Sequence, residues 1–295
     1  MNTERRALWA GVLVVLLWGA SFTIQKSAYA AMGPASFLFL RSALMATCAL
    51  ALLRWRGSPL WPPFGPREWR VLLGCTAVGP VLHIVLVTYG IHWSTPFSSA
   101  LIMACGPVCT LLLMRVMRGT QLSRRQALGV VLALGGVLLF MSDKLHGADW
   151  RASGGDGLML LATVVFSLYT IGVTPLVQRH GGPEIMCWAT LLAAPGLLLM
   201  NLPAALQAPM ASYGVATWAA FTWTVLVSAF LGWMLWSWVN AVRGVARTAP
   251  LLYGVPPVAG LVAWLASGEA FGGLKLAGAA VALTGVAWSQ RNPTT

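Results

Sequence analysis

The chain has 295 residues, of which 58% are hydrophobic and only 9% are charged, and its formal net charge at pH 7 is +12. A soluble domain carries about 25% charged residues to keep its surface hydrated, so this composition excludes an ordinary water-soluble fold and indicates a surface that largely faces lipid. The excess Lys and Arg lie in short segments between apolar runs, where they report membrane topology, and no nucleic-acid partner is expected.

Ten apolar stretches are long enough to cross a bilayer, which needs about 20 residues per helix. In chain order they are 7–25, 35–53, 71–91, 96–116, 126–141, 157–177, 185–202, 217–240, 248–267 and 271–288. The connections between them are too short to hold a soluble domain. These stretches predict an all-α polytopic membrane protein with ten transmembrane helices.

The first stretch has a competing interpretation as a cleaved signal peptide. Arg5 and Arg6 precede the apolar run, and Ala28-Tyr29-Ala30 resembles a signal-peptidase site. The run is longer than the usual apolar region of a signal peptide, and the internal repeat described below requires it. We therefore expect it to be the first membrane helix.

The distribution of Lys and Arg predicts the orientation. If the N-terminus is cytoplasmic, fourteen of the 19 Lys and Arg fall in cytoplasmic segments, four fall in outer segments, and Arg41 lies within a span. Cytoplasmic segments of membrane proteins are enriched in these residues. We expect a multi-pass protein of the bacterial inner membrane with both termini in the cytoplasm.

The cysteines predict neither a metal site nor a cofactor. All five lie inside apolar runs, where a cysteine behaves as a small hydrophobic residue. Cys105 and Cys109 share a helix face, which would also suit a metal or redox pair, but no His or carboxylate lies near them in the sequence. Packing is the favoured role.

The two halves of the sequence match each other. The fourth and ninth stretches align at an offset of 150 residues and the fifth and tenth at 149, while the first and sixth align more weakly, with Trp18 over Phe166. The matched pairs are Leu101 and Leu251, Pro107 and Pro257, Val108 and Val258, Leu111 and Leu261, Gly129 and Gly278, Ala133 and Ala282, Gly136 and Gly285, and Val137 and Val286.

An odd number of spans in each half forces the second copy into the opposite orientation. The halves are predicted at 1–142 and 156–290, as two inverted five-helix repeats. Inverted repeats are typical of secondary transporters, whose substrate lies near the middle of the membrane where the repeats meet.

Short motifs in a specific order carry a family resemblance. They are Leu17-Trp18-Gly19-Ala20-Ser21-Phe22, Leu40-Arg41, Gly106-Pro107-Val108 and Gly119-Thr120-Gln121-Leu122-Ser123 in the first half, and Pro257-Val258 and Gly268-Glu269 in the second. The chain resembles the EamA repeat of the drug/metabolite transporter superfamily, and within it the YddG-type aromatic amino-acid exporters. The resemblance implies ten helices in two inverted repeats and export of amino acids or related metabolites. Gly119-Thr120 departs from the Gly-Glu of the family in the first half.

Helix breakers near the middle of the spans are candidate hinges. Pro80, Pro107, Pro256 and Pro257 each remove a backbone hydrogen bond inside an apolar run. The freed carbonyl must find a partner or face a wet cavity. The alternative is a static kink whose polar groups are satisfied by neighbouring helices.

Polar and aromatic side chains within the spans are the candidate substrate ligands. His83 is the titratable side chain that we place near the middle of a span, and we expect it to line a substrate cavity. The alternative role is that of a neutral histidine hydrogen-bonded to a neighbouring carbonyl. Arg41 could meet a substrate carboxylate, although extension to the outer surface or tethering of a helix end is the favoured interpretation. The predicted substrate-binding residues are Trp18, Ser21, Gln25, His83, Tyr89, Ser99, Met103, Tyr169, Trp188, Trp236 and Tyr253.

Each Asp and Glu is predicted to lie in a tail, a loop or a helix end, which argues against carboxylate-based proton coupling. We therefore expect facilitated export of an uncharged or zwitterionic small molecule by alternating access, by a monomer or weak dimer in the lipid bilayer. A multidrug or nucleotide-sugar carrier is the alternative within transport, although a single Arg41 poorly matches a diphosphate. An intramembrane enzyme is the alternative of another class, and the sequence shows no nucleophile with a base, carboxylate pair or metal cluster for it.

Overall fold

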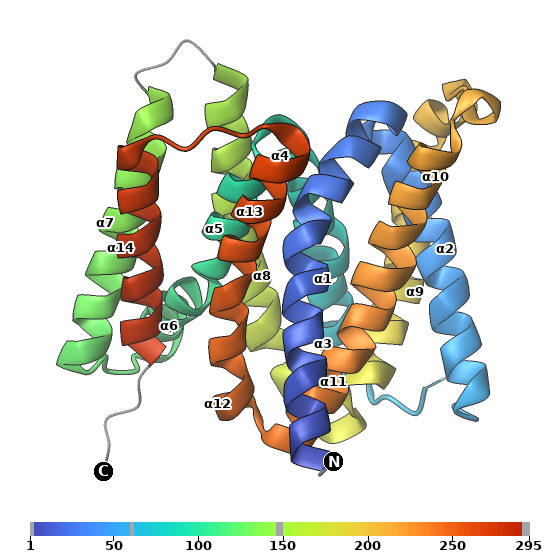
Figure 1. Cartoon of the computed structure of the whole chain (residues 1–295). Coiled ribbons are helices and arrows are strands. Elements are labelled where there is room, and N and C mark those ends of the chain that lie inside the picture. The colour runs from blue at the N-terminus through green and yellow to red at the C-terminus, as the bar shows by residue number, and fades with distance from the viewer. Residues whose placement is uncertain (1–2, 60–61, 146–149, 291–295) are drawn as a thin grey trace.

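The structure is a computed structural model that describes residues 3–59, 62–145 and 150–290. Figure 1 shows that these residues form a bundle of helices, and no strand occurs among them. We call the end of the bundle where the first helix starts the N-terminal end, and the opposite end the far end.

The first half supplies five spans. Two are the continuous helices α1 (Thr3–Met32) and α2 (Pro34–Trp55). The others are α3 (Pro66–Thr76) with the π-helix η1 (Ala77–His83) and α4 (Ile84–Trp93), then α5 (Pro96–Ala104) with α6 (Gly106–Arg118), then α7 (Arg124–Leu145).

The second half repeats this order. It begins with the continuous helices α8 (Trp150–His180) and α9 (Gly182–Gln207). A short 3₁₀ turn, η2 (Met210–Ser212), leads to α10 (Val215–Thr222), the π-helix η3 (Trp223–Leu231) and α11 (Gly232–Arg243). Then follow α12 (Val245–Thr248), the 3₁₀ segment η4 (Ala249–Gly254), α13 (Val255–Ser267) and α14 (Gly273–Gln290).

The helices confirm the predicted class of an all-α membrane protein. Among the described residues, nine helical spans have the length and hydropathy to cross a membrane. The tenth, α14, has 18 residues and is about 27 Å long at 1.5 Å per residue, close to the thickness of a bilayer core.

Several helices extend beyond the predicted stretches, because hydropathy marks the lipid core and not the end of the helix. The first stretch was expected to end at residue 25, but α1 continues to Met32. Lys26 does not break it, since its ammonium donates to the backbone carbonyls of His92 and Ser94. Likewise, Asp156 lies inside α8, where it is fully buried and accepts a hydrogen bond from Ser94 Oγ.

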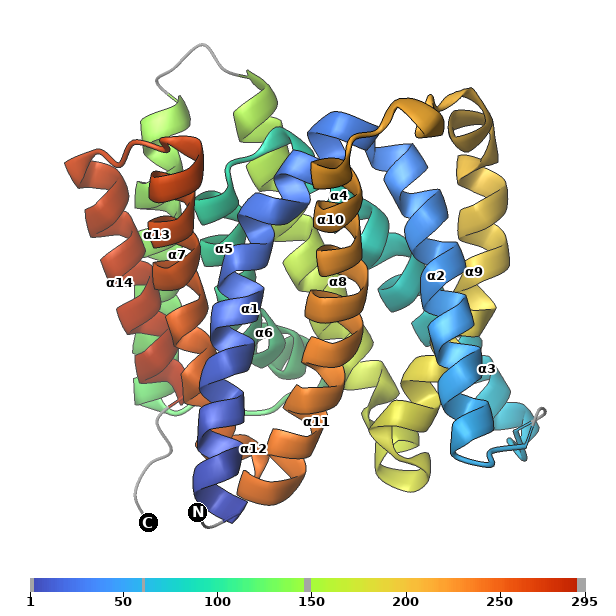
Figure 2. The ribbon, with the colours of Figure 1, turned by 45° about the vertical axis from the view of Figure 1, so that its right-hand side comes forward.

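The first helix of each half packs against helices of the other half. Helix α1 packs against α11 and α13 of the second half, and α8 packs against α4 and α6 of the first half. Figure 2, in the colours of Figure 1, shows α1 beside these orange and red helices. The two repeats are therefore interlocked, and the space between them is walled by helices of both.

The glycine faces of α7 and α14 meet in a tight internal seam. A Cβ atom on Gly136 would lie 2.2 Å from the backbone nitrogen of Ala282, and one on Gly285 would lie 2.2 Å from that of Ala133. These two contacts are related by the 149-residue offset of the repeats. The structure therefore places these small-residue faces in a contact inside the molecule.

The two π-helices occupy matching places in the repeats. Segment η1 lies in the third span and contains Pro80, and η3 lies in the eighth span. The indole Nε1 of Trp18 donates to the carbonyl of Ser228 within η3, at 3.0 Å. A wide helical turn leaves backbone groups for neighbouring side chains, and such turns often mark functional sites.

Candidate functional site

A cavity of about 520 Å³ lies between the two repeats. Its walls come from α2, η1, the start of α4, α8, α9, η3 and α11, so both halves contribute. The lining includes Val177, Gly182, Pro183 and Asn240, which lie where α8, α9 and α11 reach the N-terminal end of the bundle. The cavity therefore extends from the middle of the bundle toward that end.

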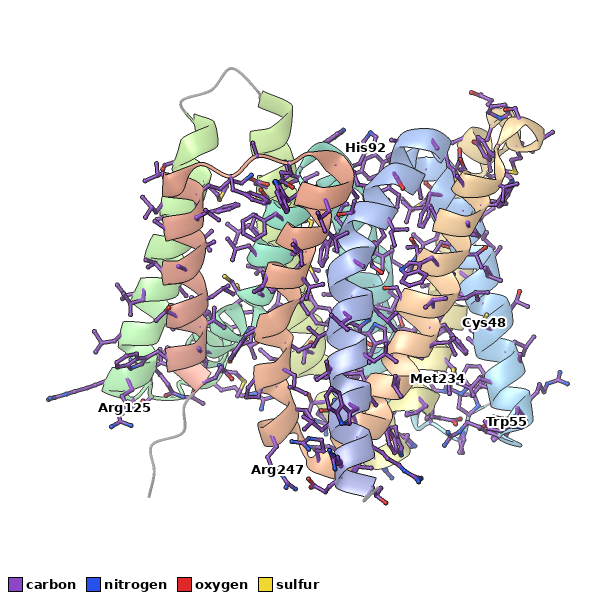
Figure 3. The ribbon with its side chains drawn as sticks, viewed as in Figure 1. Cys48, Trp55, His92, Arg125, Met234 and Arg247 are labelled. Carbon is purple, nitrogen blue, oxygen red and sulfur yellow. The ribbon has the colours of Figure 1, made fainter. Side chains whose placement is uncertain are left out.

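The ends of the bundle can be followed in Figure 3. Arg125 and Arg247 are labelled at the N-terminal end and His92 at the far end, while Met234, which lines the cavity, lies between them on α11. The cavity is thus a membrane-embedded space that leads toward the arginine-rich end.

Arg41 is the lining residue that carries a full charge. It lies on α2 and is partly buried. Its guanidinium forms no hydrogen bond and no ion pair with any residue that the structure describes. No Asp or Glu is found among the described residues that line the cavity. The lumen is consequently electropositive at this point.

His83 faces the cavity from the end of η1 and is 7% exposed. Its Nδ1 lies 3.0 Å from the carbonyl oxygen of Ala162 on α8, and its ring is 4.8 Å from that of Phe166. A carbonyl can only accept, so Nδ1 carries the proton, and in the neutral ring Nε2 is then an acceptor.

Aromatic rings of the second half line the cavity. Tyr169 and Phe166 come from α8, and Trp233 and Trp236 come from α11. Trp18 lies behind the two tryptophans, with ring centroids 6.0 Å from Trp233 and 5.6 Å from Trp236. Rings at these distances form a rigid apolar wall against which a flat or branched side chain can pack.

Polar lining groups other than Arg41 and His83 are mostly satisfied within the protein. The hydroxyls of Ser42, Thr170, Thr174 and Thr190 donate to carbonyls one turn earlier in their own helices. The side-chain oxygen of Asn240 accepts a hydrogen bond from Thr248. Arg41 is therefore the strongest donor that remains available to a ligand.

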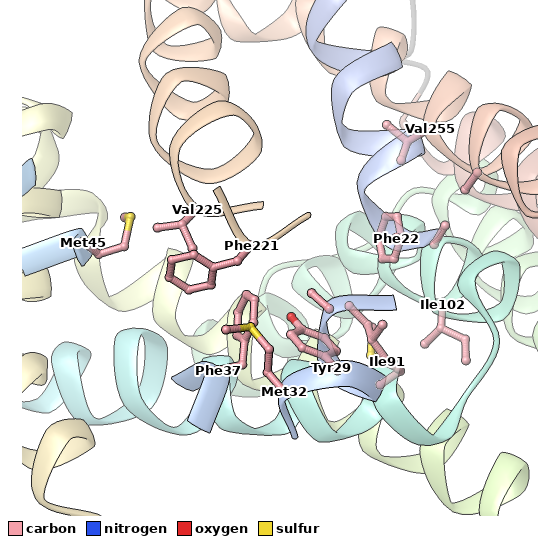
Figure 4. Close-up of a cluster of buried hydrophobic side chains, with 14 of the residues drawn as sticks. Phe22, Tyr29, Met32, Phe37, Met45, Ile91, Ile102, Phe221, Val225 and Val255 are labelled. Atoms are coloured by element: carbon pink, nitrogen blue, oxygen red, sulfur yellow. The ribbon is translucent and has the colours of Figure 1, made fainter. Parts of the chain in front are cut away.

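The far end of the cavity is closed by an aromatic plug, which we define as the buried rings of Tyr29, Phe37 and Phe221. The ring of Phe37 lies 4.6 Å from that of Tyr29 and 5.3 Å from that of Phe221, both edge to face. Figure 4 shows these rings together with Met45, which also lines the cavity. The plug therefore separates the lumen from the far end.

The sequence matches the EamA-like transporter family over residues 5–142 and again over residues 153–290. The chain belongs to the EamA-like transporter family. It is therefore a multi-pass membrane protein built from two EamA repeats, as the resemblance implied.

Some relatives of this EamA-like transporter carry names that refer to amino-acid efflux. The chain is 30% identical to the "Probable terminal-alkyne amino-acid exporter" of Streptantibioticus cattleyicolor, over 95% of this chain and 92% of the relative. It is 24% identical to the "Probable amino-acid metabolite efflux pump" of Escherichia coli, over 93% and 91%. A chain of known crystal structure matches with a TM-score of 0.65 at 17% identity, over 96% of both chains, which shows the fold alone.

The predicted ligands of this EamA-like transporter divide into two groups. His83, Tyr169 and Trp236 line the cavity together with the predicted hinge residue Pro80. Trp18 packs behind the cavity wall, as described above. Ser21 accepts from Trp223 Nε1 at 3.1 Å, and Gln25 accepts from the Tyr29 hydroxyl at 2.9 Å, so both residues connect neighbours close to the plug.

The other five predicted ligands, like Trp18, Ser21 and Gln25, lie outside the cavity lining. Tyr89 pairs with the Trp93 ring at 5.8 Å, and Met103 packs in the cluster that contains the plug. Trp188 donates to Glu184 at 3.3 Å. The hydroxyls of Ser99 and Tyr253 are buried and have no hydrogen-bond partner among the described residues.

The remaining predicted hinge prolines lie at helix starts and not inside continuous helices. Pro107 occupies the first turn of α6, directly after a break at Cys105, and Pro256 and Pro257 occupy the first turn of α13, after the 3₁₀ segment η4. A proline is tolerated in the first turn because its missing N–H would have no intrahelical partner there. The matched prolines thus mark matched breaks in the fourth and ninth spans.

Arg41 lines the cavity, whereas the sequence favoured extension of its side chain to the outer surface or tethering of a helix end. It lies eight residues into α2, about 11 Å from the start of the helix. That depth was readable from the sequence. The direction of the side chain depends on how α2 packs against α9 and η3, which no local pattern gives.

Proposed function

We propose that this EamA-like transporter exports amino acids and related metabolites, neutral and aromatic ones included, across the bacterial inner membrane by alternating access. The observation that carries the proposal is the cavity between the interlocked repeats, which is closed at the far end by the aromatic plug and extends to the N-terminal end. The predicted repeats at 1–142 and 156–290 are the two moving halves.

The orientation of the proposed state follows from charge. The N-terminal end carries most of the Lys and Arg and is therefore assigned to the cytoplasm, with both termini there. In this orientation the cavity faces the cytoplasm, where an exporter collects its substrate. The names of the relatives from Streptantibioticus cattleyicolor and Escherichia coli support an amino-acid-like cargo.

In the proposed transport step the far end of the cavity opens while the N-terminal end closes. The inverted repeats make the two closed arrangements similar in energy, as in other transporters with inverted repeats. Opening the far end requires Phe37 on α2 to separate from Phe221 on α10. The breaks at Cys105 and Gly254 and the π-helices supply places where the spans can bend.

The proposed energy source is the gradient of the substrate itself. The described cavity lining has no carboxylate that could carry a proton or bind sodium, and His83 is engaged with the carbonyl of Ala162. Export is then facilitated, and exchange of internal for external substrate needs no ion gradient.

Counterflow in proteoliposomes tests this proposal. Vesicles that contain the purified protein are preloaded with unlabelled phenylalanine, and uptake of labelled phenylalanine is followed with no pH or ion gradient. We expect transient accumulation above protein-free vesicles and no change when a pH gradient is imposed. Preloading with threonine, tryptophan or a quaternary ammonium drug in place of phenylalanine then ranks the substrates.

A matched pair of variants ties the flux to the cavity. Thr190 lines the cavity and Leu199, on the same helix α9, is 72% exposed on the outer surface. Thr190→Trp should reduce counterflow to the level of protein-free vesicles, and Leu199→Trp should leave it unchanged. Absence of counterflow with every amino acid tested would exclude the proposed function.

A further inference from the structure

We propose that the cavity recognises the carboxylate of its substrate through Arg41 and does not require an α-amino group. The substrate class is then apolar monocarboxylates, which comprises neutral amino acids together with their N-acylated and 2-oxo derivatives, while amino-acid amides and cationic amines are excluded. This inference rests on the proposed transport function and specifies its substrate.

The first argument is the contrast between Arg41 and two other cations of the described helices, Lys275 and Lys26. Lys275 lies 2.8 Å from Glu269 and 5.3 to 5.9 Å from the ring centroids of Phe97, Phe140 and Phe271. Lys26 donates to two backbone carbonyls. Both therefore have protein partners, whereas Arg41 has none among the described residues and borders an open lumen.

The second argument concerns the free-energy cost of placing the Arg41 guanidinium, unpaired among the described residues, within the membrane. A cation within the membrane is expensive, and such residues ordinarily face a water-filled cavity or a partner of opposite charge. The planar guanidinium presents several donors in a fixed fork that matches a carboxylate in two parallel hydrogen bonds. An anionic ligand would supply the charge that the protein itself does not provide.

The third argument is the absence of a matching site for a cation. The described lining contains no carboxylate that could bind an ammonium group. The neutral acceptor His83 Nε2 can take one hydrogen bond, and the Asn240 oxygen is already engaged by Thr248. Recognition of the amine is therefore weak compared with recognition of the acid.

The fourth argument is space. A volume of about 520 Å³ falls within the range of about 300–1,000 Å³ that is usual for small-molecule sites. Aromatic rings at Tyr169, Trp233 and Trp236 offer an apolar surface for the side chain. No charged group of the lining opposes an acyl substituent on the nitrogen.

The experiment compares four probes in the counterflow assay that differ only near the carboxylate or the amine. Phenylalanine has both groups, N-acetylphenylalanine and 3-phenylpropionate have the acid without a cationic amine, and phenylalaninamide has the amine without the acid. We expect the first three to drive accumulation to within about tenfold of one another, and phenylalaninamide to drive none.

The variants isolate Arg41. Arg41→Gln should weaken the apparent affinity for phenylalanine and phenylpropionate by roughly 10- to 100-fold, which is the range for losing a charge-assisted hydrogen bond to a ligand. Arg41→Lys should keep the preference for acids with a smaller loss, because the charge remains and the fork is lost. Arg54→Gln removes an exposed charge from the same helix and should change nothing.

Binding provides a second readout that does not need transport. In detergent, phenylpropionate should raise the melting temperature of the native protein and of Arg54→Gln but not that of Arg41→Gln, because a ligand stabilises the state that binds it. The ratio of phenylalanine to phenylalaninamide binding should also fall in Arg41→Gln, which a purely structural role would not change.

The outcomes separate the two proposals. If phenylalanine and phenylalaninamide exchange equally well and Arg41→Gln keeps both, the acid anchor is wrong although the protein is a transporter. If no amino acid exchanges, the transport proposal fails, and the thermal shift then decides alone. If phenylpropionate raises the melting temperature only when Arg41 is present, carboxylate recognition by Arg41 is supported. If phenylpropionate does not raise the melting temperature of the native protein, carboxylate recognition by Arg41 is overturned.

Discussion

The seam between α7 and α14 and the contacts around the two π-helices both depend on glycine, but the glycines meet different partners. In the seam, a Cβ atom added to Gly136 or Gly285 would lie 2.2 Å from a backbone nitrogen of the opposite helix. Beside the cavity, a Cβ atom on Gly79 would lie 2.4 Å from the ring of Tyr169, and one on Gly232 would lie 2.7 Å from the indole Nε1 of Trp18.

The difference indicates which contacts can rearrange. Backbone atoms of two packed helices cannot move apart locally, so the seam holds α7 and α14 at a fixed distance. A ring can rotate about its side-chain torsions into the neighbouring lumen. The seam is thus suited to be a static support, whereas the contacts of η1 and η3 can change with the state of the cavity.

The largest expected effect is a break of the seam. Gly136→Ala should destabilise the protein by about 3 kcal/mol, because the added methyl group overlaps the backbone of Ala282 and the helices must separate. Its control is Gly135→Ala on the same helix, where a Cβ meets nothing within 4 Å. Thermal unfolding followed by size-exclusion chromatography in detergent checks the pair, and equal stability of the two variants would contradict the static-seam interpretation.

A smaller effect is expected at the cavity wall. Gly79→Ala should lower the rate of counterflow several-fold while costing less stability than Gly136→Ala, because the Tyr169 ring can move into the lumen and relieve the overlap. Gly74→Ala, earlier in the same span and with open space around it, is the control. The comparison fails if Gly79→Ala unfolds the protein as completely as Gly136→Ala does.

The smallest effect is expected at Trp18. Trp18→Phe keeps most of the ring contact with Trp233 and Trp236 but removes the hydrogen bond to the Ser228 carbonyl in η3. We expect a loss of about 1 kcal/mol in thermal unfolding, the usual net worth of one hydrogen bond. Trp9→Phe on the exposed side of α1 is the control, and indistinguishable values for the two would show that the π-helix does not depend on Trp18.

The ten spans could be predicted from the sequence because hydropathy depends on composition alone. The repeat could also be predicted, since glycine and proline keep their places where backbones approach closely, as at Gly136 and Gly285. The π-helices could not be foreseen: Pro80 signals a disturbance in η1, but η3 contains no proline. The wider turn in η3 depends on tertiary contacts such as the Trp18 hydrogen bond.

The site could be predicted only in part, for a related reason. His83, Tyr169 and Trp236 were chosen for their type and depth, and they line the cavity. Ser99 and Tyr253 satisfied the same criteria but do not line the cavity, and their hydroxyls are buried without a hydrogen-bond partner among the described residues. Depth in the membrane follows from position in the chain, whereas the direction of a side chain depends on how the helices pack.

The aromatic plug has a consequence for how the proposed alternating-access cycle should depend on temperature. Separation of Phe37 from Tyr29 and Phe221 exposes apolar surface to water, and no ion pair among these three residues has to break. Exposure of apolar surface raises the heat capacity, so the free energy of opening varies with temperature along a curve. The hydrophobic contribution to the stability of the closed plug weakens on cooling, so the free-energy difference between the closed and open plug should decrease at low temperature.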